Sequence, residues 1–163
     1  MGTTTGEATG SVERVRAALR AAGHADAVQE FPDGTKTAAD AAAAIGCTVA
    51  QIAKSVIFRG GETPVLVIAS GANQVDTGKV AALTGLPIGR ADGAWVRATT
   101  GFAIGGVAPL GHATPPVVLV DEDLFALDPV WAAAGSPRHV FRTTAADLLL
   151  ISGGRRAEVA ARG

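Results

Sequence analysis

The sequence predicts a single domain of the α/β (α+β) class, in which short helices flank a mixed β-sheet. Three observations support this class. The 163 residues amount to about one domain. After a helical start, strand patterns and short helical patterns are interleaved. No segment repeats at a fixed period and no linker divides the chain, so we expect a flexible tail over residues 1–9 and one domain over residues 10–163.

Helices are predicted from short segments of helical pattern, and capping residues or glycines mark the ends of several of them. The predicted helices cover residues 11–20, 37–45, 49–53, 76–83, 94–99 and 144–151. Two of them begin with the same pattern, Thr37-Ala-Ala-Asp40 and Thr144-Ala-Ala-Asp147, in which the threonine hydroxyl can cap the first turn. Asp76 supplies a similar signal for helix 76–83, which ends before Gly85.

Strands are predicted for short apolar runs that turn signals separate. The predicted strands cover residues 26–31, 54–59, 63–70, 116–121, 131–134, 139–142 and 156–160. Strands 54–59 and 63–70 flank Gly60-Gly61, which predicts a hairpin. Residues 65–68 are all apolar, and a continuous apolar run is typical of a central strand covered on both faces.

Composition excludes several classes of protein. Hydrophobic residues make up 48% and charged residues 18%, which excludes intrinsic disorder. The chain has 14 Lys and Arg against 15 Asp and Glu, a net charge of -1. A tight electrostatic binder of nucleic acid is therefore not expected, although transient contact with an RNA end is possible. Neither DNA nor a membrane is expected as a partner.

No metal or other cofactor is expected. Cys47 is the only cysteine, which excludes an internal disulfide framework and a cysteine-cluster zinc site. The three histidines, His24, His112 and His139, are scattered and form no helical metal-binding pair. No targeting signal or membrane-spanning apolar run is present, so we expect a cytoplasmic protein.

The most unusual stretch runs from Gly101 to His112. It holds four glycines within eleven residues, and also a proline. Successive backbone N–H groups in such a loop can form an anion-binding nest or an oxyanion hole. The alternative is a structural turn between two strands, which is the more common use of glycine. The pattern matches neither a Walker loop nor a dinucleotide fingerprint.

Lys54 opens the apolar strand 54–59, where it could place a cation for a phosphate or carboxylate at the end of the sheet. The alternative is a lysine whose stem lies along the strand and whose amine reaches solvent. His112 ends the glycine-rich stretch and could act as a general base or hydrogen-bond donor. A capping or surface histidine is the alternative.

The remaining polar candidates have simpler interpretations. Cys47 has no basic neighbour in sequence, so we expect an inert packed thiol. Asp121-Glu-Asp123 follows a buried strand, where acidic residues either meet a ligand or cap the next turn. Four arginines could contact RNA phosphates but are expected to be ordinary surface charges. They are Arg138, Arg142, Arg155 and Arg156.

Two of these features carry a resemblance to a known family. One is the lysine that opens a strand, Lys54, within the sequence IAKSVIF. The other is the G-x-x-x-P loop about fifty residues later, Gly105-Gly-Val-Ala-Pro109. With the helix and strand pattern between them, residues 24–161 resemble the YbaK/EbsC-type domain, the prolyl-tRNA editing family of aminoacyl-tRNA deacylases.

The resemblance implies a mixed α/β fold with a curved, barrel-like sheet. It also implies hydrolysis of the ester that links a wrong amino acid to the 3′ end of a tRNA, usually the tRNA for proline. Such domains are free-standing or inserted in prolyl-tRNA synthetase, and a free-standing enzyme is expected here. The implied partner is the acceptor end of tRNA, and association with the synthetase itself is left open.

The resemblance also implies roles for single residues. The loop formed by Gly105, Gly106, Val107, Ala108 and Pro109 would present backbone N–H groups to the ester carbonyl. Lys54 would hold the phosphate or ribose of the terminal adenosine. Water, a tRNA hydroxyl or a substrate side chain would be the nucleophile, and His112 would touch the substrate or a catalytic water. The residues expected to bind substrate are Thr37, Ser55, Ser70, Gly71, Gly111 and Asp121.

The edited amino acid stays open at this point. Alanine-editing members often carry asparagine after the lysine, whereas this chain has Ser55. A small wrong amino acid such as cysteine or alanine is expected. Two other hypotheses are a non-catalytic module that binds an aminoacyl group or nucleotide beside a tRNA synthetase, and a hydrolase of small esters outside translation.

Overall fold

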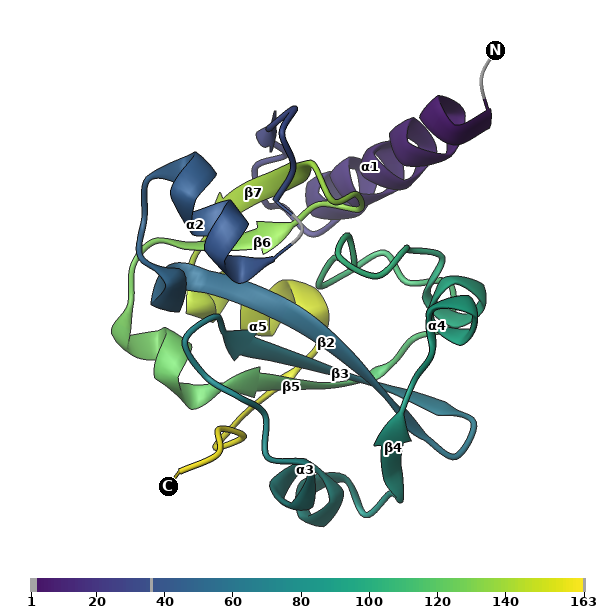
Figure 1. Ribbon diagram of the computed structural model, residues 1–163, viewed down its shortest axis with the longest axis vertical. Helices are drawn as coiled ribbons and strands as arrows, with labels where there is room; N and C mark the ends of the chain where they lie inside the picture. Colours follow the sequence, from purple (N-terminus) through teal and green to yellow (C-terminus); the bar gives the residue numbers. More distant parts are fainter. Residues whose placement is uncertain (1–2, 36, 163) are drawn as a thin grey trace.

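The computed structural model describes residues 3–35 and 37–162 (Figure 1). The helices of this part are α1 Thr3–Ala21, α2 Ala38–Ile45, α3 Thr77–Thr84, α4 Gly93–Thr100 and α5 Ala145–Ser152, with short 3-10 turns at Val49–Gln51 and Glu122–Ala126. The strands are β1 Val28–Glu30, β2 Ile52–Gly60, β3 Thr63–Ser70, β4 Ile88–Arg90, β5 Val117–Asp121, β6 Val130–Ala133, β7 His139–Thr143 and β8 Arg155–Ala157. Within these residues, no helix is both long enough and apolar enough to cross a membrane.

All the strands belong to one mixed sheet. Seven follow the order β1-β7-β6-β2-β3-β5-β8, and β4 pairs separately with β2. The pairs β2–β6, β3–β5 and β5–β8 are parallel, and the other pairs are antiparallel. β3 lies between β2 and β5 and is buried from Pro64 to Ser70. The predicted fold class is confirmed, and so is the prediction of a central strand over this run.

β2 has a divided outer edge. Along one side it pairs with β3 from Ala53 to Gly60, which is nearly its whole length. On the other side it pairs with β6 at Ile52 and Ala53, and with β4 only from Phe58 to Gly60. Residues 54–57 therefore have no strand partner on that side, and the sheet is open there.

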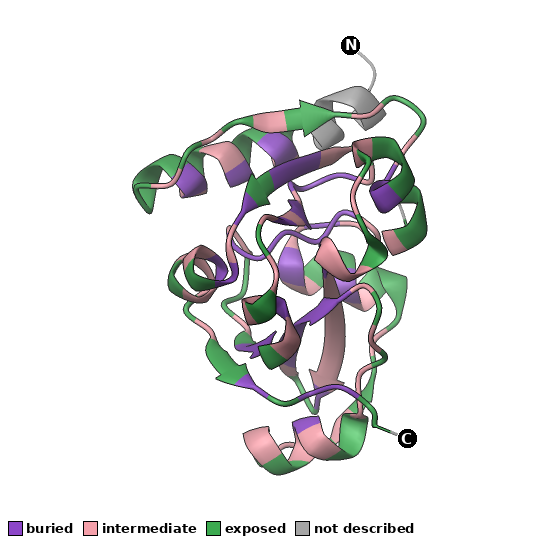
Figure 2. Ribbon diagram, turned by 90° about the vertical axis from the view of Figure 1, so that its left-hand side faces the viewer, coloured by how far each residue is buried: buried purple, intermediate pink, exposed green. Residues whose placement is uncertain are grey.

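Both faces of the sheet are covered (Figure 2). On one face, the largest core cluster joins the sheet to α1, α4, α5 and residues 102–110, with Leu19, Phe102 and Leu148 almost fully buried. On the other face, Val80 of α3 packs against β3 and β5. α2 forms a third, smaller cluster with Ile52 of β2, against which Trp131 packs.

Capping side chains and glycines set the boundaries of four helices, and for α2, α3 and α5 these are the predicted signals. The side chains of Thr37, Asp76, Asp92 and Thr144 each accept a hydrogen bond from the backbone N–H three residues later. The corresponding helices end at glycines with left-handed backbone angles, which only glycine adopts without strain. These glycines are Gly46, Gly85, Gly101 and Gly153.

Four local predictions need correction. α1 begins at Thr3, so residues 3–9 continue the helix where a flexible tail was expected, while residues 1 and 2 lie outside the described part. The predicted helix 49–53 is a single turn, because Ile52 and Ala53 already pair with β6. The hairpin turn uses Gly61-Glu62, one residue later than expected. β4 was not predicted, because three residues are too short for a strand pattern.

Candidate active site

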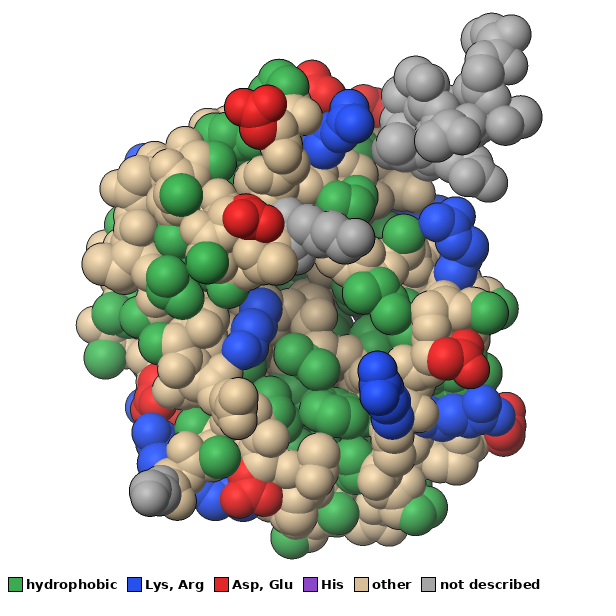
Figure 3. Space-filling model, in the orientation of Figure 1, with side chains coloured by type: hydrophobic (Ala, Val, Ile, Leu, Met, Phe, Trp, Pro, Cys, Tyr) green, Lys and Arg blue, Asp and Glu red, His purple; other side chains and the backbone are tan. Residues whose placement is uncertain are grey.

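A small pocket opens beside the unpaired stretch of β2. Its volume is about 80 Å³, enough for several waters or a small side chain. The residues that line it are Thr35, Thr37, Ala38, Ala41, Ile52, Ala53, Lys54, Ser55, Gly105, Val107, Trp131, Ala132, Ala133 and Val140. The face viewed in Figure 1 is hollowed, with hydrophobic and basic side chains at the rim (Figure 3). The pocket therefore combines α2, β2, β6, β7 and the glycine-rich stretch.

β2 brings a cation and a hydroxyl to this pocket. Lys54 and Ser55 are consecutive strand residues, so their side chains start on opposite faces of the sheet. Both still line the pocket, because it lies at the open edge of the strand. The Ser55 hydroxyl is buried and has no hydrogen-bond partner among the described residues. It is therefore a candidate donor for a ligand that enters the pocket.

The Lys54 amine is held from outside the pocket. Its Nζ donates a hydrogen bond of 2.5 Å to the carbonyl oxygen of Asn73. Partial burial lowers the pKa of Lys54, while the negative charge of Asp121 opposes that effect by favouring the ammonium form. An ammonium has three donors, so two are left for a phosphate, hydroxyl or carboxylate.

Asp121 anchors this arrangement from beneath. It is fully buried, and its carboxylate accepts hydrogen bonds from the N–H of Ser70 at 3.0 Å, from Nδ2 of Asn73 at 2.9 Å and from the N–H of Asp123 at 2.9 Å. Nδ2 of Asn73 also donates to Asp123, whose pKa is lowered by Arg162 and Asn73. The network fixes the turn whose carbonyl oxygen holds Lys54.

The glycine-rich loop forms one wall of the pocket. Gly105 has φ +90°. A Cβ on Gly106 would lie only 2.7 Å from the backbone of Ser136, so the loop packs directly on the β6–β7 turn. The Gly106 N–H donates to the Ala103 carbonyl oxygen at 3.0 Å. No hydrogen bond joins the N–H of Gly105, Val107 or Ala108 to any described residue. Gly105 and Val107 line the pocket, so their N–H groups are candidate donors there.

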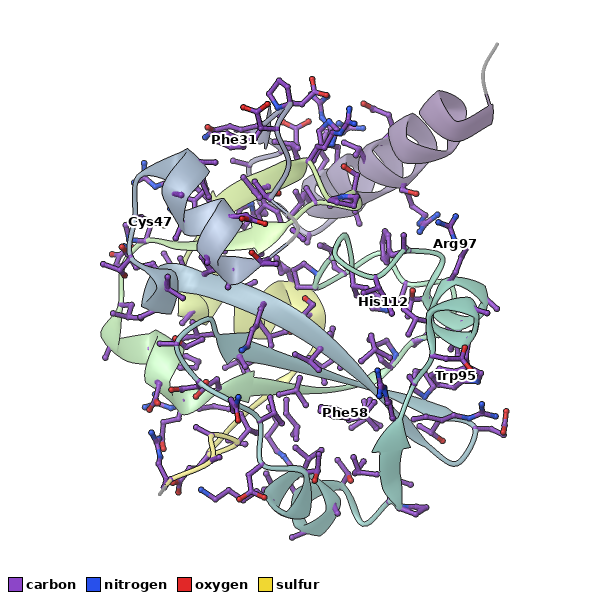
Figure 4. The ribbon with its side chains drawn as sticks, in the orientation of Figure 1. Phe31, Cys47, Phe58, Trp95, Arg97 and His112 are labelled. Atoms are coloured by element: carbon purple, nitrogen blue, oxygen red, sulfur yellow. The ribbon has the colours of Figure 1, made fainter. Side chains whose placement is uncertain are left out.

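His112 lies behind the loop rather than in the pocket (Figure 4). Its Nε2 is 2.6 Å from the carbonyl oxygen of Ala108, and its ring meets Phe102 edge-on with 5.2 Å between centroids. Nδ1 is buried and has no partner among the described residues. Burial lowers the pKa of His112, which favours the neutral ring with Nε2–H as the donor to Ala108.

The predicted site residues fall into three groups. Those that line the pocket are Thr37, Lys54, Ser55, Gly105 and Val107. Gly106, Ala108 and Pro109 are buried in the same loop. Ser70, Gly71, Gly111, His112 and Asp121 are not among the described lining residues. Gly71 is required by packing, since a Cβ there would collide with the Val49 carbonyl oxygen, and its N–H donates to Ile52.

Sequence reasoning missed three kinds of site residue. Trp131 and Val140 line the pocket, although they were interpreted only as weak strand residues. Asn73 positions Lys54, and its only signal in the sequence was its place directly after a buried strand. Thr35 lines the pocket from a loop without any recognisable pattern.

The residues expected to have ordinary roles do lie outside the pocket. Cys47 is half-buried, and burial raises the pKa of its thiol. His24 Nε2 lies 2.9 Å from the Thr143 hydroxyl. Arg156 pairs with Glu122 at 3.6 Å. The other three arginines considered above, Arg138, Arg142 and Arg155, do not line the pocket either.

Known proteins resemble this chain in sequence. The sequence model of the aminoacyl-tRNA editing domain matches residues 32–151. The uncharacterized protein YwhH of Bacillus subtilis (strain 168) is 34% identical over 122 residues, which are 74% of this chain and 78% of YwhH. The matched region holds Lys54, Ser55 and the whole glycine-rich loop.

Solved structures resemble it as well. The crystal structure of a protein proposed to be a trans-editing enzyme for prolyl-tRNA synthetase is 44% identical, with a TM-score of 0.88 over 93% of this chain and 98% of that one. The hypothetical protein APE2540 shares the fold at 24% identity, with a TM-score of 0.84 over 91% of this chain and 99% of that one. The resemblance drawn from Lys54 and the Gly105–Pro109 loop is thus confirmed. The chain belongs to the aminoacyl-tRNA editing domain family and is an aminoacyl-tRNA deacylase.

Proposed function

We propose that this enzyme acts in trans on tRNA for proline that carries a small wrong amino acid such as cysteine or alanine. The observation that carries the proposal is one small pocket that Lys54, Ser55, Gly105 and Val107 all line, in which the Ser55 hydroxyl and the N–H groups of Gly105 and Val107 have no partner among the described residues. The similar structure at 44% identity is a proposed trans-editing enzyme for prolyl-tRNA synthetase. It supports both the choice of tRNA for proline as the substrate and the action in trans. A tRNA substrate also agrees with the cytoplasmic location expected above.

The loop would stabilise the charge that forms on the ester carbonyl. Attack on the carbonyl carbon places negative charge on its oxygen, and the N–H groups of Gly105 and Val107 are free to donate to it. The bond from the carbonyl carbon to the ribose oxygen then breaks. With water as the nucleophile, that oxygen takes up the proton that the water loses, and the products are the free amino acid and a tRNA with an intact 3′ end. With the substrate's own side chain as the nucleophile, the first product is a cyclic ester or thioester, which water then opens. A tRNA hydroxyl that attacks would only move the acyl group, so water would again complete the hydrolysis.

Lys54 would bind the tRNA rather than the reacting carbonyl. Its ammonium keeps one donor on Asn73 and has two for the phosphate or ribose of the terminal adenosine. Fixing the adenosine places the ester over the loop. Ser55 would donate to a polar group of the substrate beside it.

The attacking oxygen would come from outside the protein. The described lining residues include no Cys, His, Asp or Glu, and the one amine among them, Lys54, donates to the Asn73 carbonyl oxygen and is assigned to the tRNA, so we assign no side-chain base to the Ser55 hydroxyl. Water, a tRNA hydroxyl or the substrate's own side chain is then the nucleophile.

The pocket walls would select the amino acid by size. Five of the lining residues are alanines on α2, β2 and β6, and Trp131 is the largest side chain in the lining. A volume of about 80 Å³ suits a short side chain. One methylene changes binding by only about 1–3 kcal/mol, so selectivity between cysteine and alanine is expected to be modest.

A deacylation panel tests the proposal. The protein is incubated with tRNA for proline charged with cysteine, alanine, serine or proline, and the loss of ester is followed over time. We expect selective loss of a small wrong amino acid. Lys54→Ala should lower kcat/KM about 100-fold, because a charge-assisted contact to the tRNA is removed. Lys79→Ala is the matched control, since Lys79 of α3 pairs with Glu158 and does not line the pocket.

Two results would contradict the proposal. If no charged species loses its ester above the buffer rate, even with prolyl-tRNA synthetase present, the substrate is wrong. If Lys54→Ala retains full activity while its thermal unfolding is unchanged, the assigned role of Lys54 is wrong.

A further inference from the structure

We propose that Arg14 of helix α1 is a positioning residue for the carbonyl-binding loop. The inference rests on the proposed function, because it assumes that this loop binds the ester oxygen. Arg14 Nε donates to the Gly111 carbonyl oxygen at 2.9 Å, and its Nη2 donates to the Gly101 carbonyl oxygen at 3.0 Å. Gly101 and Gly111 stand at the two ends of the glycine-rich stretch. One guanidinium therefore holds both ends of the loop.

A stack of rings extends this contact to the middle of the loop. The Arg14 guanidinium lies over the Phe102 ring, with 4.5 Å between Cζ and the ring centroid. Phe102 meets the His112 ring edge-on, and His112 Nε2 contacts the Ala108 carbonyl oxygen at 2.6 Å. Arg14 is thus linked through two rings to the peptide that precedes Pro109.

Helix α1 is a rigid support for this contact. Val15 and Leu19 are fully buried in the main core. A Cβ on Gly135 would lie 2.7 Å from the Ser11 carbonyl oxygen, so the helix backbone packs directly on the β6–β7 turn. Gly106 packs on the next residue of that turn, Ser136. The loop therefore contacts both α1, through Arg14, and the β6–β7 turn, through Gly106, and these two supports also pack on each other (Figure 1).

This support lies outside the residues that define the family. The family match begins at residue 32, after the end of α1. Arg14 itself is exposed and is not among the described residues that line the pocket. We infer that it acts on the chemical step through the loop and not on substrate binding. Misplacing catalytic donors by a fraction of an ångström lowers the rate, and about 1 Å can lower it 100-fold.

The test compares Arg14→Gln with Arg14→Lys and with a control on the same helix. Arg20→Ala is that control, because Arg20 is exposed and pairs only with Asp26 among the described residues. For Arg14→Gln we expect kcat on the mischarged tRNA to fall about tenfold with KM changed less than about twofold. Arg14→Lys keeps the charge but not the planar fork, so it should recover only part of kcat. Arg20→Ala should match the wild type.

A second readout does not depend on activity. Hydrogen exchange of the Gly106 amide, which donates to Ala103, reports how firmly the loop is held. It should speed up several-fold in Arg14→Gln, stay unchanged in Arg20→Ala and be partly restored in Arg14→Lys. If Arg14→Gln is too unstable to measure, the comparison of Arg14→Lys with the wild type decides.

The outcomes separate this inference from the proposed function. An active wild type with unchanged kcat and Gly106 exchange in Arg14→Gln overturns the inference alone. A rise in KM with kcat unchanged also overturns it, because Arg14 would then bind substrate. A wild type that removes no amino acid overturns the proposed function, and the Gly106 exchange still decides whether Arg14 holds the loop.

Discussion

At the scale of single residues, His112 shows how the environment of a side chain defines its part in the site. The sequence allowed a general base, a substrate contact or a surface histidine. The structure buries the ring behind the loop, with Nε2 on the Ala108 carbonyl oxygen and Nδ1 without a described partner. Such an arrangement favours the neutral ring, because a second ring N–H would have no acceptor.

His112 should make stability depend on pH. Burial holds its pKa below the usual 6.5 in the folded protein, so the unfolded chain takes up a proton first as the pH falls. The contribution is full above about pH 7 and is lost as the pH falls below 6.5 towards the folded pKa. In His112→Gln, whose amide can still donate to Ala108, the free energy of unfolding should fall less between pH 7.5 and 5. Urea unfolding at each pH measures this, and equal slopes in the two proteins would contradict it.

At the scale of elements, the chain contains the same helix start twice. Thr37 caps α2 and Thr144 caps α5, each through its hydroxyl on the backbone N–H of an aspartate three residues later. The two caps are alike in chemistry but differ in place. Thr37 also lines the pocket, whereas Thr144 does not. Comparing the two threonines therefore distinguishes the effect of a cap on stability from the effect of a pocket residue on activity.

Replacing each threonine with alanine should reveal this difference. Thr37→Ala and Thr144→Ala should each lower the free energy of unfolding by about 1 kcal/mol, the usual contribution of such a cap. Only Thr37→Ala should change kcat/KM for deacylation, by several-fold. Thr→Ser at either position should restore the cap. Equal loss of activity in both alanine variants would show that α2 affects the site only through stability.

The elements were largely predictable because their signals are local. Capping residues and glycines set the limits of α2, α3, α4 and α5, and apolar runs marked β2, β3 and β5. The elements that were missed or misassigned also have physical explanations. β4 is too short for periodicity, and Ile52 and Ala53 became strand residues because tertiary pairing with β6 outweighs local helix propensity.

The site was predictable only where a residue carries its own signal. Lys54 stood out as a charge in an apolar strand, and the glycine loop stood out by composition. Asn73, Trp131 and Arg14 became visible only with the fold, because each serves the site through contacts across the chain. Conversely, Ser70 and Asp121 were expected to bind substrate, but neither is among the described residues that line the pocket, and both form hydrogen bonds within the protein.

At the scale of the whole molecule, charge is nearly balanced and much of it is paired internally. The net charge is -1, and several surface cations already form ion pairs with carboxylates. These cations are Arg16, Arg20, Arg59, Lys79, Arg156 and Arg162. Lys54 is the one cation among the described residues that line the pocket. Few phosphates can therefore be neutralised when the acceptor end binds.

Activity should accordingly depend only weakly on salt. With one or two phosphate contacts to a single strand, raising the salt from 50 to 200 mM should lower kcat/KM about threefold to sevenfold. A protein with six to ten contacts would lose about 10³–10⁵ in affinity over that range. Deacylation rates at low substrate concentration measure the slope. A loss above about 100-fold would indicate a basic surface that binds the body of the tRNA.

The parallel pairing of β2 with β6 has a consequence for synthesis on the ribosome. Ile52 and Trp131 are neighbours in that pair and both line the pocket, although the glycine loop and two helices lie between them in the chain. A nascent chain that has released β2 and the loop, but not β6, still lacks a wall of the pocket. Hydrolysis should therefore begin only after β6 has emerged and docked. An unfinished chain would then be inactive as a deacylase, also towards the aminoacyl-tRNAs that supply its own remaining residues.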